Sequence, residues 1–248
     1  MKPSGKTGIV GCKLTSNEME RYTRQIQLPD FGIETQQKLK SARALVIGAG
    51  GLGSPVLLYL AGAGVGTIGI VDDDRVSESN LQRQILYETS QIGLPKVLCA
   101  KARLELLNPT INFQIYDFRL TDDNATPLLT QYDIIIDCTD NLSTRYTIDR
   151  ASQKTGKPFI HASVCEFQGQ VSVFNYRGAP SYEDLFPYLP DNEKFTQPQG
   201  IIGAFVGIVA GIQAMEAINV LTNSESTLAG YLLLIDMKKH EFRKVRIS

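Results

Sequence analysis

The chain has 248 residues, of which 43% are hydrophobic and 21% are charged, a composition typical of a folded globular protein. Its 25 Lys and Arg residues balance 26 Asp and Glu residues, so the net charge is -1. This balance excludes a global positive field that would attract nucleic acid or an anionic membrane, so any anion-binding site must be local. We expect neither nucleic acid nor a membrane as a partner.

Cysteine usage and the N-terminus bear on the compartment. The four cysteines are too few and too widely spaced for a disulfide framework, and no CxxC pair is present to begin a zinc site. The basic N-terminus is followed by a short apolar stretch, residues 8–11, which is far shorter than the core of a signal peptide. We therefore expect a cytoplasmic protein.

A helical arm is expected first. The run Thr15-Ser-Asn-Glu18 matches a capping box and predicts a helix that continues to Gln25. Apolar, β-rich runs then alternate with helical stretches, with strands at 44–47, 67–71, 112–115 and 133–136 and helices at 52–62, 96–107, 124–130 and 141–155. Parallel strands need helical crossovers and are buried on both faces. The alternation therefore predicts an α/β fold with a doubly wound, Rossmann-like, mostly parallel sheet.

The pattern changes after residue 158. Strands are expected at 159–160 and 170–174, and a long polar connection, residues 178–200, follows them. Connections of this length are more often functional or mobile than idle. Residues 230–235 and 241–247 predict a closing hairpin, so the sheet should end in an antiparallel C-terminal extension.

The apolar run 201–212 predicts a buried helix, because about 12 residues are fewer than the roughly 20 that a bilayer requires. Gly203, Gly207 and Gly211 recur every four residues and so share one helix face. Such a face allows another backbone to approach closely. Packing inside the subunit and packing between subunits explain this spacing equally well.

A glycine-rich loop joins the first expected strand of the sheet to the helix after it. Gly48, Gly50 and Gly53 form a GxGxxG pattern, with Gly51 inside it. Glycines in this position let backbone N–H groups and a helix N-terminus meet a phosphate without obstruction by Cβ. The position between a strand and a helix favours a nucleotide site over a simple tight turn.

The residues after the second strand help to distinguish an NAD site from an ATP site. That strand leads into Asp72, where a carboxylate commonly binds a ribose hydroxyl, and to this point NAD and ATP fit equally. Asn80, Arg83 and Lys96 then add a donor and two cations. A triphosphate that loses pyrophosphate needs cations where charge builds up. Arg83 and Lys96 would each singly fit a solvated helix face, but their position near the loop favours phosphate binding.

Asp140 follows the fourth strand, at the edge of the sheet where open α/β folds bind ligands. A carboxylate beside phosphates is the usual protein contribution to a Mg²⁺ site. Asp140 could instead cap the helix expected from Asn141, and the two roles are compatible. We expect one domain, residues 1–248, with three parts: an arm (1–40), a nucleotide-binding part (41–160), and strands, crossover loop, buried helix and hairpin (161–248).

These motifs together resemble the ubiquitin-activating-enzyme-like adenylyltransferases, the ThiF/MoeB/HesA family, and most of all its bacterial homodimeric type. The likeness spans nearly the whole chain, and several motifs in the correct order are far more specific than a lone glycine loop. The motifs are Arg21-Tyr-Thr-Arg-Gln25, Gly48-Ala-Gly-Gly-Leu-Gly53, Val71-Asp-Asp-Asp74, Ser79-Asn-Leu-Gln-Arg-Gln84, Gly93-Leu-Pro-Lys96, Asp137-Cys-Thr-Asp-Asn141, Gly169-Gln-Val171 and Gln213-Ala-Met-Glu-Ala217.

The resemblance implies an enzyme that uses ATP and Mg²⁺ to adenylylate a small ubiquitin-like sulfur-carrier protein ending in Gly-Gly, for thiamin or molybdopterin synthesis. It implies that Asp72 binds the ribose, that Asn80, Arg83 and Lys96 bind the phosphates, and that Asp140 binds Mg²⁺. Arg24 would reach into the ATP site of the other subunit of a homodimer. The expected catalytic residues are Arg24, Arg83, Lys96 and Asp140. A carboxylate attacks, so no general base is needed and charge neutralisation is the main contribution.

Cysteine positions depart from the family pattern. Members commonly bind zinc through two CxxC pairs, and this chain has none, so we expect no zinc. Some members carry a reactive cysteine in the crossover loop, which here spans residues 194–200 without one, so a separate sulfurtransferase is expected. Cys165 follows a strand end on the expected site side, but its sequence neighbours offer nothing to activate it. We expect a buried, inert thiol there and a core position for Cys138.

Other functions remain open at this point. An NAD(P)-linked oxidoreductase could use the same glycine loop, but it gives no role to Arg24, Arg83 and Lys96. A non-catalytic scaffold subunit could keep the fold, although the full set of matched polar residues argues against it. Within the family, a peptide or a transfer-RNA substrate would use the same chemistry, because acceptor choice depends on variable loops.

Overall fold

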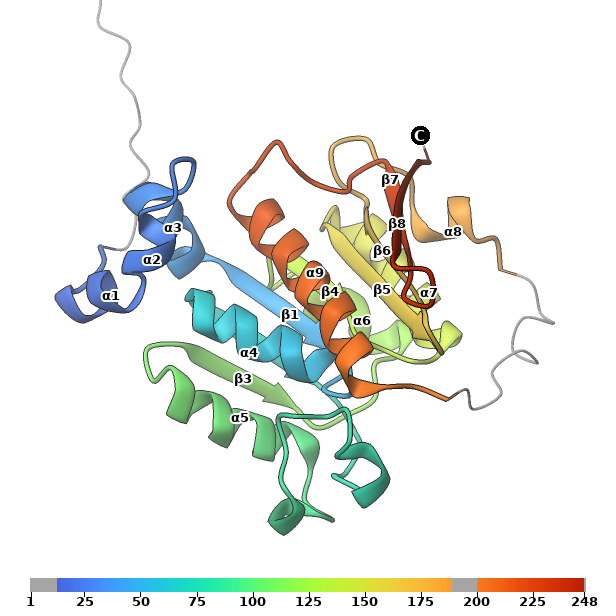
Figure 1. The fold of residues 1–248 in the computed structure, drawn as a ribbon, viewed down its shortest axis with the longest axis horizontal. Coiled ribbons are helices and arrows are strands. Elements are labelled where there is room, and N and C mark those ends of the chain that lie inside the picture. The colour runs from blue at the N-terminus through green and yellow to red at the C-terminus, as the bar shows by residue number, and fades with distance from the viewer. Residues whose placement is uncertain (1–12, 189–199, 248) are drawn as a thin grey trace, which may run out of the picture.

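The computed structural model describes residues 13–188 and 200–247, which are organised around one eight-stranded sheet (Figure 1). The strand order is β3-β2-β1-β4-β5-β6-β7-β8. The first five strands in the chain run parallel: β1 (Arg43–Ile47), β2 (Thr67–Val71), β3 (Asn112–Tyr116), β4 (Ile134–Asp137) and β5 (Phe159–Cys165). The rest pair antiparallel: β6 (Gln168–Phe174), β7 (Tyr231–Asp236) and β8 (Glu241–Arg246).

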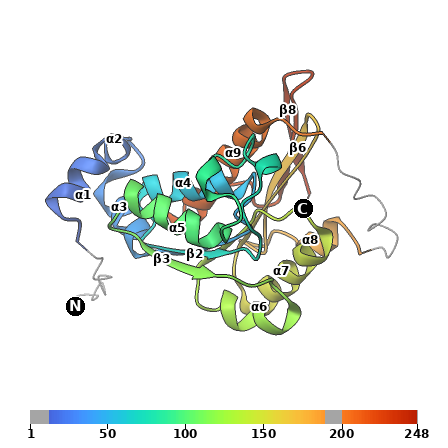
Figure 2. The ribbon, with the colours of Figure 1, turned by 90° about the horizontal axis from the view of Figure 1, so that it is seen from below.

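Helices cover both faces of the sheet, as Figure 2 shows. One face carries α4 (Gly53–Ala63), α5 (Lys96–Leu107) and α9 (Gly203–Leu221). The other carries α6 (Asp122–Leu129), α7 (Leu142–Thr155) and the short α8 (Tyr182–Leu185). Two single-turn helices, η1 (Glu78–Asn80) and η2 (Thr89–Gln91), lie between β2 and α5. The doubly wound, mostly parallel sheet with an antiparallel C-terminal extension is confirmed.

The central strands are apolar on both sides because both sides are covered. Side chains alternate along a strand, so Val46 and Ile136 join the core beneath α4 and α9. Leu45 and Ile135 join the second core on the opposite face of the sheet. This double burial explains why the strands appear in the sequence as continuous apolar runs.

The N-terminal arm comprises α1 (Ser16–Arg21), α2 (Thr23–Ile26) and α3 (Gly32–Ser41). The capping box of Thr15 and Glu18 is present as predicted. Tyr22 is buried and accepts a hydrogen bond from Nδ2 of Asn108, the residue that follows α5. The arm therefore lies at the end of the sheet where β1 begins, at the opposite end from the glycine-rich loop (Figure 1).

Several elements differ in extent from the sequence predictions. The helix expected at 124–130 begins at Asp122, because Thr121 and Asn124 form a capping box. The strand expected at 159–160 continues to Cys165, where it pairs with Gln168. The connection expected at 178–200 contains α8, and its residues 189–199, which include most of the proposed crossover loop, lie outside the described residues.

The helix predicted from the apolar run is longer than expected. At 19 residues α9 is long and apolar enough to cross a membrane by length and composition, but half of it is buried in the protein. The side chain of Gln213 is fully buried and donates to the backbone oxygens of Asp137 and Ile160. Gln213 thus ties α9 to β4 and β5, as expected of a core helix.

Candidate active site

A cavity of about 510 Å³ lies at the carboxyl edge of the parallel strands. The strand order reverses between β1 and β4, and open α/β sheets bind ligands where such a reversal occurs. The volume lies within the range of small-molecule sites. Eight residues predicted to form the site contribute to its wall: Gly48, Gly50, Gly51, Asp72, Asn80, Arg83, Lys96 and Asp140.

The glycine loop is shaped by close backbone contacts. Gly48 has a φ of 94°, and a Cβ atom there would lie 2.7 Å from the backbone oxygen of Cys138. A Cβ atom on Gly53 would collide with the backbone oxygen of Gly48. Only glycine permits this packing. Because α4 begins at Gly53, its N-terminus lies next to the loop, where the helix dipole favours a phosphate. In its first turn the Ser54 N–H already donates to Gly50 O, and Pro55 has no N–H.

Asp72 fastens the glycine loop to the end of β2. Its Oδ2 atom accepts a hydrogen bond from the backbone N–H of Ala49 at 2.7 Å, and its Oδ1 atom accepts one from Asp74 N at 2.9 Å. Burial raises the pKa of Asp72, although Lys96 opposes this shift. Each carboxylate oxygen has a second lone pair, so Asp72 can hold the loop and still accept from a ribose hydroxyl.

Lys96 occupies the first turn of α5 and is almost fully buried. Its Nζ atom lies 2.7 Å from Oδ2 of Asp74, an exposed side chain. The alternative considered above, that Lys96 lies on a solvated helix face, is therefore wrong, because the start of α5 packs against the connection after β2. The backbone N–H of Lys96 also donates to Asp74 O at 3.0 Å.

Arg83 lies in the turn after η1 and lines the cavity. Its Nη1 atom donates to Ser79 O at 3.2 Å. Its aliphatic carbons lie against the glycine loop, 3.5 Å from where a Cβ atom on Gly51 would stand. Arg83 is half-buried beside the loop, so the alternative that it lies on a solvated helix face is also wrong.

Asp140 is exposed, and within the described residues its carboxylate has no hydrogen-bond or ion-pair partner. The capping role considered for it belongs to the next residue. Asn141 Oδ1 accepts from the backbone N–H of Thr144 at 2.9 Å and so caps α7. The carboxylate of Asp140 therefore stands at the cavity wall with no partner among residues 13–188 and 200–247.

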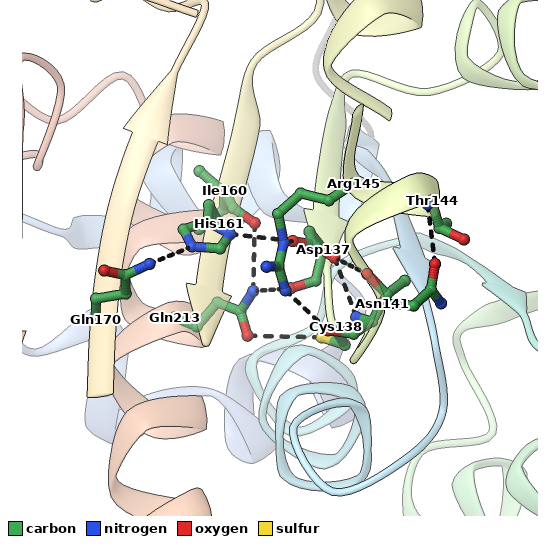
Figure 3. Close-up of polar contacts among 10 residues, drawn as sticks. Asp137, Cys138, Asn141, Thr144, Arg145, Ile160, His161, Gln170 and Gln213 are labelled. Carbon is green, nitrogen blue, oxygen red and sulfur yellow. Dashed lines mark hydrogen bonds and ion pairs between the residues drawn. The ribbon is translucent and has the colours of Figure 1, made fainter. Parts of the chain in front are cut away.

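Sequence reasoning missed a buried ionic cluster beside Asp140, shown in Figure 3. Asp137 Oδ2 accepts from Arg145 Nε at 2.8 Å and lies 3.0 Å from His161 Nδ1. Burial opposes ionisation of Asp137, yet Arg145 and His161 hold its pKa well below the usual range. Burial, with Arg145, lowers the pKa of His161 to about 4. The sequence signal for this cluster was Arg145, an arginine in the first turn of α7 and four residues after the cap Asn141.

Gly53 packs against Gly48 without lining the cavity, and two other residues singled out in the sequence lie away from it. Arg24, in α2, is exposed and is absent from the cavity wall. The 11-residue α4, about 16 Å long, separates the arm from the glycine loop. Cys165 is exposed, so the prediction of a buried thiol is wrong: it borders a hollow formed by residues of β5 to β8 and their hairpin turn. Cys138 is buried as predicted.

The donor set of the cavity fits ATP and Mg²⁺. Backbone N–H groups and two cations suit phosphate oxygens. The carboxylate of Asp140, which has no partner in the described part of the chain, suits a hard cation that keeps most of its waters. The ligand atoms of Asp72, Asp73 and Asp74 also lie within 4.8 Å of one another. Two of these three carboxylates are already engaged, by the Ala49 N–H and by Lys96. Asp140 is therefore the better candidate for Mg²⁺.

A glycine loop, a carboxylate after β2 and two cations around one cavity at the point of strand reversal define a nucleotide-binding α/β protein. The ThiF family model matches residues 22–248. The chain therefore belongs to the ThiF family, and the resemblance seen in the sequence is confirmed.

Curated relatives match over most of the chain. It is 44% identical over 237 residues to adenylyltransferase and sulfurtransferase MOCS3 of Anopheles gambiae, covering 95% of this chain and 54% of that protein. It is 42% identical over 240 residues to sulfur carrier protein adenylyltransferase of Thermus thermophilus, covering 94% of this chain and 89% of that protein. The chain thus spans about half the length of the MOCS3 relatives.

Solved structures share the fold. E. coli MccB crystallised with ATP matches with a TM-score of 0.82 at 20% identity, covering 92% of this chain and 71% of that one. PaaA matches with a TM-score of 0.81 at 22% identity, covering 98% of this chain and 78% of that one. At these identities the likeness concerns the fold alone.

Proposed function

We propose that the chain is an ATP-dependent adenylyltransferase that activates the C-terminal glycine of a small ubiquitin-like sulfur-carrier protein, for thiamin or molybdopterin synthesis. The observation that carries this proposal is the gathering of the glycine loop, Asp72, Lys96, Arg83 and the free carboxylate of Asp140 around one cavity. The names of the ThiF-family relatives support it, since they include sulfur carrier protein adenylyltransferase.

In the proposed reaction a carboxylate oxygen of the carrier attacks the α-phosphorus of ATP. An O–P bond forms, the bond between the α-phosphorus and the bridging oxygen breaks, and pyrophosphate leaves with that oxygen. Both reactants are anions, so Lys96 and Arg83 lower the barrier by neutralising charge as it develops. Mg²⁺ held at Asp140 would neutralise charge on the leaving pyrophosphate. The attacking group is already ionised, so no side chain needs to remove a proton.

We also propose a homodimer in which Arg24 serves the site of the partner. The separation of the arm from its own cavity supports this arrangement. An apolar surface is available on the helices of one face, where Tyr59, Ile208 and Met215 are exposed. On the same stretch of α9, a Cβ atom on Gly207 or Gly211 would meet nothing within 4 Å, whereas one on Gly203 would strike the backbone of Gln82. Gly203 thus serves packing inside the subunit, and the other two are open to a partner.

We further propose that sulfur reaches the activated carrier through a separate sulfurtransferase, that the enzyme works in the cytoplasm, and that it needs no zinc. The basis is the sequence: the proposed crossover loop, residues 194–200, has no cysteine, and no CxxC pair occurs anywhere in the chain.

Pyrophosphate exchange into ATP tests the proposed activity. Purified enzyme with Mg-ATP should exchange labelled pyrophosphate into ATP when a carrier ending in Gly-Gly is added. Exchange with short peptides instead would point to a peptide substrate. Binding of carrier without exchange would favour a scaffold subunit, and binding of NADH without exchange would favour an oxidoreductase.

A further inference from the structure

We propose that Asp137, Arg145 and His161 form a positioning network that fixes the loop of residues 138–141, and with it the carboxylate of Asp140, against the glycine loop. The proposal deepens the function above and rests on it, since it takes Asp140 to serve the reaction. None of the three side chains needs to touch ATP for this role. They act through the backbone of Thr139.

The network holds both backbone polar groups of one loop residue, Thr139. The backbone N–H of Thr139 donates to Asp137 Oδ1 at 3.0 Å, and the backbone oxygen of Thr139 accepts from Arg145 Nη2 at 3.0 Å. The hydroxyl of Thr139 also donates to Asp137 Oδ1. Thr139 immediately precedes Asp140, whose own side chain has no partner within the described residues. The backbone position from which the Asp140 side chain extends is therefore set by its neighbour.

The network is itself rigid because each member is buried and paired. Asp137 and His161 are fully buried and Arg145 is 7% exposed. Asp137 receives Arg145 from α7 and His161 from β5, so three elements meet at one carboxylate. A buried ion pair contributes little net stability, because desolvation offsets the attraction, but it fixes geometry. The desolvation cost of the buried ion pair is consistent with a role in positioning the loop rather than in stabilising the fold.

The hydrogen bonds of the network can be assigned donors and acceptors from Gln170 through His161 to Asp137. Ionised Asp137 only accepts, so neutral His161 must carry its proton on Nδ1. Its Nε2 atom then accepts from Gln170 Nε2 at 3.1 Å. Figure 3 shows Gln170, His161, Asp137 and Arg145 in this sequence of contacts. Tyr182, whose ring centroid lies 5.0 Å from that of His161, is the remaining titratable side chain at this histidine among the described residues.

The opposite side of the loop touches the nucleotide site. A Cβ atom on Gly48 would lie 2.7 Å from the backbone oxygen of Cys138, so the two loops are in direct contact. Gln213 Nε2 anchors the start of the loop by donating to Asp137 O at 2.6 Å. A change at Asp137 thus alters the spacing between the glycine loop, which would bind phosphates, and the carboxylate that would bind Mg²⁺.

Arg145→Lys and a pair of His161 variants test the role. Lysine keeps the charge but cannot donate to both Asp137 and Thr139 in the geometry of a guanidinium. His161→Leu removes the donor to Asp137, whereas His161→Asn replaces it, because the amide nitrogen of asparagine takes the place of Nδ1. Each full-length variant is assayed for ATP affinity without metal, for the Mg²⁺ concentration that gives half-maximal exchange, and for kcat.

We expect Arg145→Lys and His161→Leu to raise the half-saturating Mg²⁺ concentration about tenfold or more, the scale seen for residues that orient metal ligands. Metal-free ATP affinity should stay within about twofold, and His161→Asn should restore near-normal Mg²⁺ dependence. An unchanged Mg²⁺ requirement in Arg145→Lys, with Asp140→Asn inactive, would overturn the positioning role and leave the proposed function intact. Full activity of Asp140→Asn would instead remove the Mg²⁺ role of Asp140, and a wild-type enzyme that shows no carrier-dependent exchange would overturn the proposed function.

A second measurement, the tautomer of His161, can be made with the network intact. The chain has two histidines, so nitrogen-15 NMR of the imidazole rings is simple to assign with a His240→Gln variant. His161 should be the neutral Nδ1–H tautomer between pH 6 and 8. The Nε2–H tautomer, or an imidazolium in this range, would contradict the arrangement of the network.

Discussion

The Nζ atom of Lys96, a side chain only 3% exposed, lies 2.7 Å from Oδ2 of Asp74, a side chain 69% exposed. The pairing keeps a buried cation neutralised at the wall of the cavity by a partner that water can reach. A phosphate entering the cavity can take over this role, because Asp74 can turn to solvent at little cost. In the proposed reaction the cation would thus be in place before the nucleotide arrives, as electrostatic catalysis requires.

Replacing Lys96 with methionine should remove this cation while keeping an apolar stem of similar length. We expect adenylylation to fall about 100-fold or more, the usual effect of deleting one charge-stabilising donor. Asp74→Asn is the matched control, because it keeps the cation. It should change the rate less than about fivefold, as expected for an ion pair with an exposed partner. Single-turnover formation of pyrophosphate measures both, and equal losses would contradict the role given to Lys96.

Asp140 and Asn141 are adjacent but should give opposite results. Asp140→Asn should abolish Mg²⁺-dependent adenylate formation with an unchanged melting temperature, because this carboxylate has no partner within the described residues. Asn141→Ala removes the cap of α7 and should lower the melting temperature by about 2–4 °C, while the carboxylate remains. Calorimetry and the exchange assay distinguish them. Near-normal turnover of Asp140→Asn would remove its metal role.

Arg24 can be tested by mixing two inactive proteins. Arg24→Ala and Asp140→Asn should each be inactive alone. In a shared site, every mixed dimer contains one site with both residues intact, so an equal mixture should regain about a quarter of wild-type activity after subunit exchange. Failure to regain activity, with exchange verified by differently tagged subunits, would contradict the shared site.

His161 should make stability depend on pH. Burial, with Arg145, lowers its pKa in the folded protein to about 4, whereas in the unfolded chain the pKa is near 6.5. Between these values the unfolded state binds a proton that the folded state excludes. The free energy of unfolding from this group is therefore fully present above pH 6.5 and falls as the pH drops toward 4, by at most about 1.4 kcal/mol per pH unit.

Urea unfolding at pH 7.5, 6.5 and 5.5 measures this dependence. His161→Asn is the control, because asparagine keeps a donor to Asp137 and does not titrate. Burial raises the pKa of Asp72 and Glu216, and these groups contribute with the opposite sign, so the slope must be compared between the two proteins. Equal slopes in wild type and variant would show that His161 binds its proton equally in both states.

The sequence predicted the fold and eight of the residues that line the cavity for one physical reason. Gly48 and Asp72 follow a strand directly, Asp140 comes shortly after β4 ends at Asp137, and the carboxyl ends of parallel strands meet at one edge. Lys96 was found in the same way, at the start of a crossover helix. Residues whose positions depend on chain-local structure were therefore predictable.

Contacts that cross the sheet were not predictable. Asp137 meets His161, 24 residues further along the chain, because β4 and β5 pair with these two residues in register. Nothing local to His161 indicates that partner. The exposure of Cys165 was missed for a similar reason, since it depends on which part of β5 to β8 the helices leave uncovered.

The central claim is that this cavity joins AMP to the C-terminus of a carrier protein. The most direct test is pyrophosphate exchange into ATP with a small ubiquitin-like carrier ending in Gly-Gly, beside the same carrier shortened by its last glycine. We expect Mg²⁺-dependent exchange and a carrier adenylate, detected by intact mass spectrometry, with the full-length carrier alone. Exchange that is equal with the shortened carrier, or absent with every Gly-Gly carrier tried while Mg-ATP still binds, would contradict this claim.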